Sequence, residues 1–181
     1  MNRSIFKAHQ LPIEQLRQLL HISQSHLLVE MIDKDDWERL LYGKKTKTIF
    51  SIYSSTKALK GKLSFYVDNN EIKIKVHPLK TDVDNSLQLD NKDIETLKSG
   101  RAITKIIQNA KHIIQLDLDI NELMSIPFKH VRLPSKISST TLSYSDKILI
   151  KNGYTVKKGN IAIKLNLNNI SNLEISNNFK S

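Results

Sequence analysis

The residues of this sequence whose type and spacing suit a function are lysines interleaved with tyrosines, a pattern that could bind nucleic acid. Residues 44–80 carry nine lysines against two acidic residues, a net charge of +7, and residues 129–158 carry a net charge of +6. Ammonium groups in such tracts can contact phosphates, and Tyr53 or Tyr66 could stack on bases. The lysines that we expect to bind a partner are Lys44, Lys45, Lys47, Lys60, Lys62, Lys73, Lys75, Lys151, Lys157 and Lys158.

The same lysines also fit a solvated sheet face, and both interpretations stay open at this point. If residues 72–76 form a strand, Lys73 and Lys75 lie on one face and Ile72, Ile74 and Val76 on the other. Residues 30–38 have the opposite sign, a net charge of −4. A surface polarised in this way raises the rate of encounter with a polyanion.

Carboxylates near residue 120 could bind calcium only if they formed a complete loop. Asp117-x-Asp119-x-Asn121 has the spacing of the first ligands of a calcium loop. The sixth position is Glu122 instead of glycine, and the twelfth is Phe128 instead of the bidentate glutamate. We interpret these residues as turn residues and predict no metal site.

Other catalytic chemistry has little support in the sequence. The chain has no cysteine, and its six histidines have no metal-ligand spacing. It also lacks the glycine-rich nucleotide motifs and the G-x-S-x-G elbow. We therefore predict no enzyme, no cofactor and no small-molecule substrate. A cryptic hydrolase, built from serine, histidine and aspartate residues that meet only in the fold, is kept as a hypothesis of a different class.

The first 43 residues are predicted to be helical. Pro12 suits a helix start, and the apolar residues that follow have helical spacing. Ser23 and Asp33 are candidate N-caps of a second and a third helix, and Gly43 can end the third.

Alternating apolar residues predict strands in the rest of the chain. Runs at 63–67 and 72–76 flank the turn 68–70 and predict a hairpin. We expect a short helix at 90–97 that ends at Gly100 and another that is capped by Ser143 and ends at Gly153. Further strands are predicted at 114–118, 123–128, 161–167 and 173–175, and residues 138–141 are predicted to be a polar loop.

The sequence also contains an internal repeat. Residues 89–100 match residues 142–153 at a constant offset of 53, with Asp93 over Asp146 and Gly100 over Gly153. A third copy at offset 57 places Asp36 over Asp93. We predict an α+β fold with a helical N-terminal unit followed by repeated units of short helix, glycine and antiparallel β-hairpin. The predicted domains are 1–80 and 81–181, the second holding repeats 89–128 and 142–176.

A series of motifs over residues 8–176 resembles the paired domain of unknown function found in Bacteroidetes proteins of conjugative and other mobile elements. In chain order the motifs are Leu11-Pro12-x-Glu14-x-Leu16, Leu40-Leu41-x-Gly43-Lys44-Lys45-Thr46, Leu97-Lys98-x-Gly100, Gln115-Leu116-Asp117, Asn121-Glu122-Leu123, and Ile137 with Leu142. The chain departs from the family at Ile13, where tryptophan is usual, and lacks the usual glycine of the hairpin after Gly100. No catalytic residue carries over from this resemblance.

The resemblance implies a bacterial mobile element and work on nucleic acid, often beside topoisomerase-like or toprim modules. With no enzyme sequence in this chain, we expect a non-catalytic, basic binding protein. The most concrete hypothesis is an anti-CRISPR-like inhibitor that binds an RNA-guided nuclease, a ribonucleoprotein, and interferes with guide or target RNA. The alternative is an accessory DNA-binding module for conjugative transfer or topoisomerase action.

The N-terminus lacks the apolar core of a signal peptide and no apolar run reaches the roughly 20 residues of a membrane span, so we expect a cytoplasmic protein without a membrane partner. The oligomeric state stays open.

Overall fold

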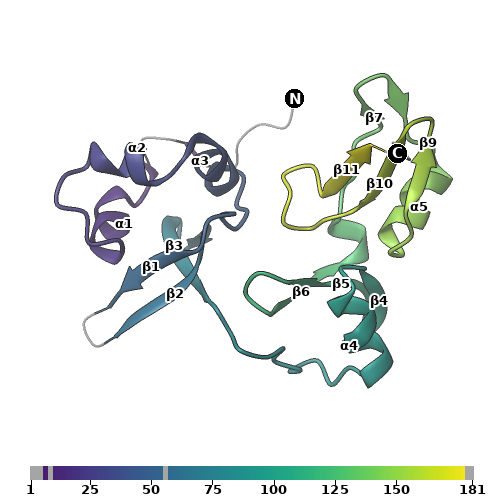
Figure 1. Ribbon diagram of the computed structural model, residues 1–181, viewed down its shortest axis with the longest axis horizontal. Helices are drawn as coiled ribbons and strands as arrows, with labels where there is room; N and C mark the ends of the chain where they lie inside the picture. Colours follow the sequence, from purple (N-terminus) through teal and green to yellow (C-terminus); the bar gives the residue numbers. More distant parts are fainter. Residues whose placement is uncertain (1–5, 8–9, 55–56, 178–181) are drawn as a thin grey trace. The chain divides into compact units, whose positions relative to one another are not determined.

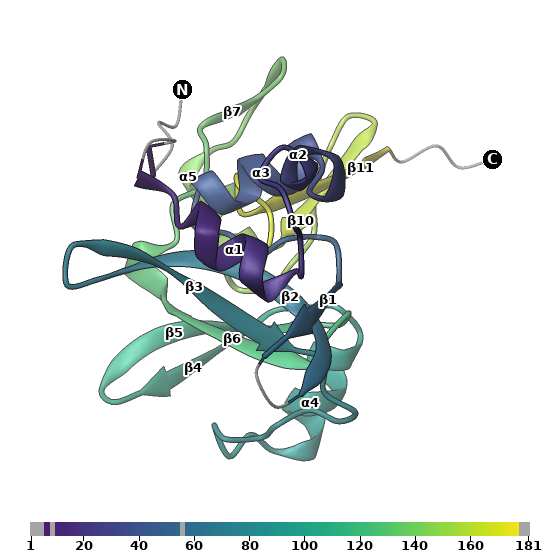
Figure 2. The same cartoon turned by 90° about the vertical axis from the view of Figure 1, so that its left-hand side faces the viewer.

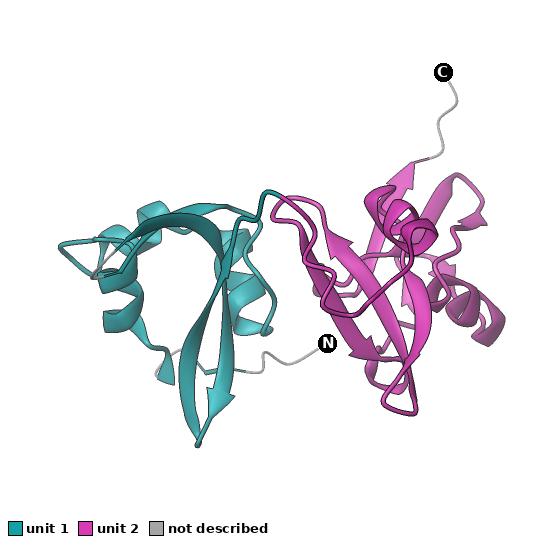
Figure 3. Cartoon of the chain, turned by 90° about the horizontal axis from the view of Figure 1, so that it is seen from below, with its two compact units in different colours: residues 1–81 teal, residues 82–181 magenta. Residues whose placement is uncertain are grey.

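A computed structural model describes residues 6–7, 10–54 and 57–177 of the chain. The fold is α+β, with short helices and antiparallel sheets. The chain divides into two compact units, residues 1–81 and 82–181 (Figure 3). Within the described ranges, no helix is both long and apolar enough to cross a membrane.

In its described residues, the first unit has three helices followed by a three-stranded antiparallel sheet in the order β1-β2-β3 (Figure 1). Its elements are α1 (Ile13–Leu19), α2 (Leu27–Met31), α3 (Lys34–Leu41), β1 (Phe50–Tyr53), β2 (Ala58–Asp68) and β3 (Glu71–Pro78).

The ends of the helices follow local sequence signals in α3 but not in α2. Asp33 caps α3, because its carboxylate accepts the N–H of Asp36 at 2.7 Å. Gly43 follows α3 with a φ of 66°, a conformation that glycine adopts at little cost. The prediction that Ser23 caps a helix was wrong, because α2 begins at Leu27 and has no side-chain cap.

The hairpin of β2 and β3 confirms the predicted turn. Asn69 and Asn70 connect the strands with φ values of 50° and 65°, the positive angles that a two-residue hairpin turn requires. Asparagine tolerates these angles better than most residues, which explains its presence at both positions.

The core of the first unit lies between the helices and one face of the sheet. Leu16, Leu28 and Leu40, one from each helix, are fully buried together with Leu63 and Phe65 of β2. Figure 2 shows α1 lying along the sheet. Each helix is too short to be stable alone in water, so its stability comes from this shared burial.

The second unit contains two successive segments of helix and three-stranded antiparallel sheet. The first segment comprises α4 (Asn91–Lys98), β4 (Ile103–Ile107), β5 (Ala110–Asp117) and β6 (Glu122–Pro127). The second comprises α5 (Tyr144–Lys151), β9 (Val156–Lys158), β10 (Ile161–Leu165) and β11 (Leu173–Asn177). Between them lie a 3-10 turn, Phe128–His130, and a two-stranded pair, β7 (Lys136–Ile137) and β8 (Thr140–Thr141). Strand β8 corrects the second half of the predicted polar loop at 138–141, whereas Ser138 and Ser139 form the turn between β7 and β8.

Strand β5 is buried on both faces and joins the two segments of the second unit. Ile114 and Leu116 pack beneath α4 with Leu97, whereas Ile113 packs into the core that the second segment forms. Gln115 lies on the same face as Ile113, and its side-chain amide donates to the carbonyl of Leu165 at 3.0 Å. The Gln115 Oε1 accepts the N–H of Leu167 at 2.8 Å. One side chain thus bonds the backbone at the end of β10 to the middle of β5.

Candidate nucleic-acid interface

The register of β2 and β3 gathers the lysines of both strands on one face. Residues that pair directly in an antiparallel sheet lie on the same face. Lys62 pairs with His77, Ser64 with Lys75, and Tyr66 with Lys73. Strand β1 continues this face, because Ser51 pairs with Lys60. We call the set Lys60, Lys62, Lys73, Lys75, Tyr66 and His77 the basic face.

The opposite face of the same strands is apolar. Leu63 and Phe65 are buried, and Ile72, Ile74 and Val76 pack against them as part of the core. This confirms the prediction that Lys73 and Lys75 lie opposite the apolar residues of β3. Burial of the apolar face fixes the register, since a slip by one residue would exchange the two faces.

Members of the basic face differ in exposure. Lys60 and Lys75 are exposed, and the Tyr66 side chain is 43% exposed. Lys62 and His77 are buried, and His77 Nε2 lies 2.8 Å from the hydroxyl oxygen of Ser64. Lys60, Lys75 and Tyr66 are therefore the members that a phosphate or a base reaches directly.

Lys73 already has a carboxylate partner. Its ammonium group donates to Asp68 Oδ2 at 2.5 Å. The hydrogen bond and charge of Asp68 raise the pKa of Lys73, so its ammonium group stays protonated. Both side chains are partly exposed, and such an ion pair contributes little to stability. A phosphate can therefore compete with Asp68 for this lysine.

The lysines after Gly43 belong to a loop that is fixed by hydrogen bonds from its backbone. Asp36 accepts the N–H groups of Lys47 and Thr48 at 2.5 and 3.2 Å. Thr46 Oγ1 accepts the N–H of Leu63 of β2 at 3.0 Å. The loop is thus tied both to the start of α3 and to β2, which holds it in one conformation.

Side chains of this loop lie in different surroundings. Lys47 is exposed, whereas Lys45 is buried. Burial, together with the nearby charge of Arg39, lowers the pKa of Lys44 to about 8. The charge of Lys44 therefore changes in the mildly basic range.

The three predicted site lysines of the second unit lie in three different environments. Lys158 pairs with Asp146 at 2.8 Å, and Lys157 is exposed on β9. Lys151 lies at the end of α5, where its ammonium group is 4.9 Å from the centre of the Phe128 ring. The structure does not bring these three ammonium groups together.

A different group of residues meets at Phe128, and the sequence did not predict it. Lys111 of β5 also lies over the ring, with its Nζ 4.5 Å from the ring centre. Lys111 and Lys151 are far apart in the chain, so no local spacing signals that they share one aromatic ring. Only the pairing of β5 with β6 and the packing of α5 bring them to Phe128.

The described histidine and acidic side chains form no metal centre, and two histidines lie within hydrogen-bond distance of serine hydroxyls. Among the described residues, no cluster of three histidine or acidic side chains could hold a metal ion. The Asp119 N–H donates to Asp117 Oδ1 at 3.3 Å, a contact typical of a turn. His21 stacks on Tyr53 with 4.1 Å between ring centres, and His112 bonds Ser125. His9 lies outside the described residues.

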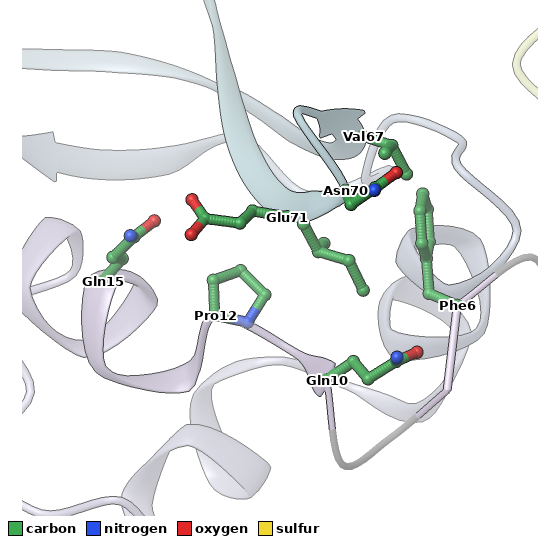
Figure 4. A pocket seen from close by; sticks show the side chains of 8 residues that line it. Phe6, Gln10, Pro12, Gln15, Val67, Asn70 and Glu71 are labelled. Atoms are coloured by element: carbon green, nitrogen blue, oxygen red, sulfur yellow. The ribbon is translucent and has the colours of Figure 1, made fainter.

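A pocket of about 490 Å³ lies beneath the tip of the β2–β3 hairpin (Figure 4). Its lining residues are Phe6, Gln10, Pro12, Gln15, Val67, Asn70, Glu71 and Ile72. Among the described residues of this lining, Glu71 is the one titratable side chain. A hydrolytic mechanism usually needs an acid and a base, or a nucleophile and a base, and the described lining residues contain neither pair.

Neither family models, nor curated proteins, nor solved structures match this chain.

Proposed function

We propose that this chain is a non-catalytic protein that binds nucleic acid, alone or within a nucleoprotein, through the basic face of its first unit. The observation that carries the proposal is the strand register, which places Lys60, Lys73 and Lys75, none of them buried, on the face opposite the core. Lys62 lies on the same face but is buried. Lysines on a sheet can track a phosphate backbone, and Tyr66 offers a ring for stacking. A face that recognises phosphate and stacks bases without reading their edges has little sequence preference.

The most concrete form of this proposal is an anti-CRISPR-like inhibitor that docks on an RNA-guided nuclease in the cytoplasm. Its support is the sequence resemblance to domains of bacterial mobile elements, together with a face suited to guide or target RNA. The alternative is an accessory DNA-binding module for conjugative transfer or topoisomerase action. The same basic face would serve that alternative, so the two differ in the partner and not in the surface.

The finer architecture is also a proposal. We infer that residues 89–128 and 142–176 are two copies of one helix–glycine–sheet unit. In support, Asp93 pairs with Lys105 and Asp146 with Lys158, and both residues of the second pair lie 53 positions after those of the first. Gly100 and Gly153 follow the two helices with φ values of 83° and 85°.

Binding through the basic face can be tested with two double variants of equal charge. Lys60→Glu with Lys75→Glu reverses two exposed members of the face. Lys34→Glu with Lys92→Glu reverses two exposed lysines in the first turns of α3 and α4, where a negative charge is favourable. Fluorescence anisotropy with labelled single-stranded RNA and DNA should show affinity reduced on the order of tenfold or more in the first variant only. Equal affinities of the two variants would reject the basic face.

The partner can be identified by affinity capture from a bacterial lysate with and without nuclease treatment. Retention of an RNA-guided nuclease after nuclease treatment supports the inhibitor. Capture of DNA alone, lost after DNase, supports the accessory module. Tight RNA-independent capture that survives the Lys60→Glu, Lys75→Glu variant would contradict both.

A further inference from the structure

Two lysines of the second unit lie over the Phe128 ring, and a third, Lys147, lies near one of them on α5. Lys111 and Lys151 both lie over the ring, with 4.5 and 4.9 Å between Nζ and the ring centre. Lys151 also donates to the carbonyl of Phe128 at 3.2 Å. Lys147 lies one helical turn before Lys151 on α5, so its side chain lies on the same side of the helix. We call Lys111, Lys147, Lys151 and Phe128 the Phe128 cluster.

The cluster contains positive charge that no carboxylate neutralises. Within the described part of the chain, the polar partners of these lysines are neutral: Lys111 donates to Asn152 Oδ1 at 3.0 Å, and Lys147 donates to Ser135 Oγ at 2.8 Å. By contrast, Lys105, Lys158 and Lys164 of the same unit each pair with an acidic side chain. Within the described residues, the Phe128 cluster thus brings two lysines to one aromatic ring without an acidic partner.

Burial and repulsion disfavour the charged form of one lysine of the cluster, Lys151. Burial lowers the pKa of Lys151, and the neighbouring charge of Lys147 lowers it further. The last turn of α5 offsets part of this cost, because its carbonyl groups favour cations. A bound anion would offset the remainder.

The ring holds the ammonium groups in place before a ligand arrives. Phe128 packs against the core of the second unit, so its position is fixed. Cation–π contact and the hydrogen bonds to Asn152 and to the Phe128 carbonyl restrict Lys111 and Lys151. A site whose donors are already ordered loses less entropy when it binds.

From this geometry we propose that the Phe128 cluster is a second, separate binding site for a phosphate group. Ammonium groups are point-charge donors that suit phosphate oxygens. The phosphate belongs either to a nucleic-acid backbone or to a free polyphosphate. In its nucleic-acid form the inference rests on the function proposed above, whereas in its free-phosphate form it does not.

The test uses the full chain and two ligands, a labelled single-stranded oligonucleotide and inorganic tripolyphosphate. NMR resonances of the Phe128 ring, assigned through Phe128→Leu, report occupancy of the site. Lys111→Gln with Lys151→Gln removes two charges from the cluster. Lys92→Gln with Lys98→Gln removes two charges from exposed positions on α4 and is the matched control.

We expect the ring resonances to shift on addition of ligand in the wild type and the control, and not in Lys111→Gln, Lys151→Gln. Oligonucleotide affinity should fall on the order of tenfold, and the logarithmic salt slope should decrease by about 1.4 for two lost phosphate contacts. A shift with both ligands supports a general phosphate site, and a shift with the oligonucleotide alone supports a nucleic-acid backbone. A shift with tripolyphosphate and equal oligonucleotide affinities of the two variants support the free-phosphate form. If neither ligand shifts the ring resonances, or if the shift persists in Lys111→Gln, Lys151→Gln, the inference is overturned.

The two proposals fail in different ways. If Lys60→Glu, Lys75→Glu binds RNA normally while Lys111→Gln, Lys151→Gln does not, the basic face is wrong and the Phe128 cluster stands. If tripolyphosphate shifts the Phe128 ring in a protein that binds no oligonucleotide, the proposed function fails and the phosphate site stands.

Discussion

Asp146 and Lys158 form an ion pair of 2.8 Å that joins the first turn of α5 to strand β9. Asp146 also completes a capping box, because its carboxylate accepts the N–H of Ser143 at 2.8 Å while Ser143 Oγ accepts the N–H of Asp146 at 3.1 Å. One carboxylate thus links the helix start to the strand that follows Gly153. Asp93 and Lys105 make the corresponding pair at α4 and β4.

Loss of the N-cap should destabilise the second unit measurably. Ser143→Ala removes the hydroxyl that accepts the N–H of Asp146, and such a change costs about 1 kcal/mol. Thermal unfolding followed by circular dichroism should show a lower Tm. Ser139→Ala, at an exposed turn position, should leave the Tm unchanged. Equal Tm values for the two variants would show that the cap does not stabilise α5.

Acid stability should depend on Asp146. Hydrogen bonds from Lys158 and Ser143 lower the pKa of Asp146 from 3.8 to about 2. Because the pKa is lower in the folded state, this stabilisation is complete above about pH 4 and is lost as the pH falls towards 2. Lys158→Met should therefore flatten the fall in Tm over this range, and Lys157→Met should not. An identical acid profile for both variants would contradict the assignment.

Gly153 should tolerate no side chain. Its φ is 85°, and a Cβ at this position would lie 2.0 Å from the carbonyl oxygen of Ala102. Gly159 also has a positive φ, 56°, but a Cβ there meets no atom within 4 Å. We expect Gly159→Ala to cost about 1 kcal/mol through strain alone and Gly153→Ala about 4 kcal/mol or more, measured by chemical unfolding. Similar losses of stability in Gly153→Ala and Gly159→Ala would mean that the backbone at Ala102 moves easily to make room for a Cβ.

Gln115 should be required for the stability of the second unit. Gln115→Leu removes both hydrogen bonds to the backbone of Leu165 and Leu167 and leaves a buried carbonyl and a buried N–H without this partner. We expect a loss of about 3 kcal/mol in the free energy of unfolding. Gln18→Leu, on the exposed side of α1, is the control and should cost less than about 0.5 kcal/mol. A small effect at Gln115 would mean that water replaces both bonds.

Local signals made much of the fold predictable. Asp33, Asp90 and Ser143 each accept the N–H three residues ahead, as helix N-caps do. Alternation of apolar and polar residues predicted the β2–β3 hairpin and which residues of β3 share a face. This is possible because side chains of a strand alternate between its two faces, so the pattern is visible in adjacent residues. The short pair β7–β8 was missed, since two-residue strands leave no periodic pattern.

Tertiary contacts made the side-chain partners unpredictable. The sequence showed that Lys158 is basic but not that Asp146 would pair with it across Gly153. The sequence marked Lys151 as a candidate binding residue. It did not show that Lys111 of β5 would lie over the same Phe128 ring as Lys151 of α5. Charge can be counted along a chain, whereas the counter-charge of each lysine is set by packing.

The salt dependence of RNA binding tests the central claim most directly. We would measure the dissociation constant of a labelled single-stranded RNA by anisotropy over a series of salt concentrations, for the wild type and for Lys60→Glu, Lys75→Glu. The account expects a logarithmic slope of about −2 or steeper for the wild type, equivalent to three or more phosphate contacts, and a clearly shallower slope for the variant. Binding that is absent, or whose strength does not change with salt, would contradict it.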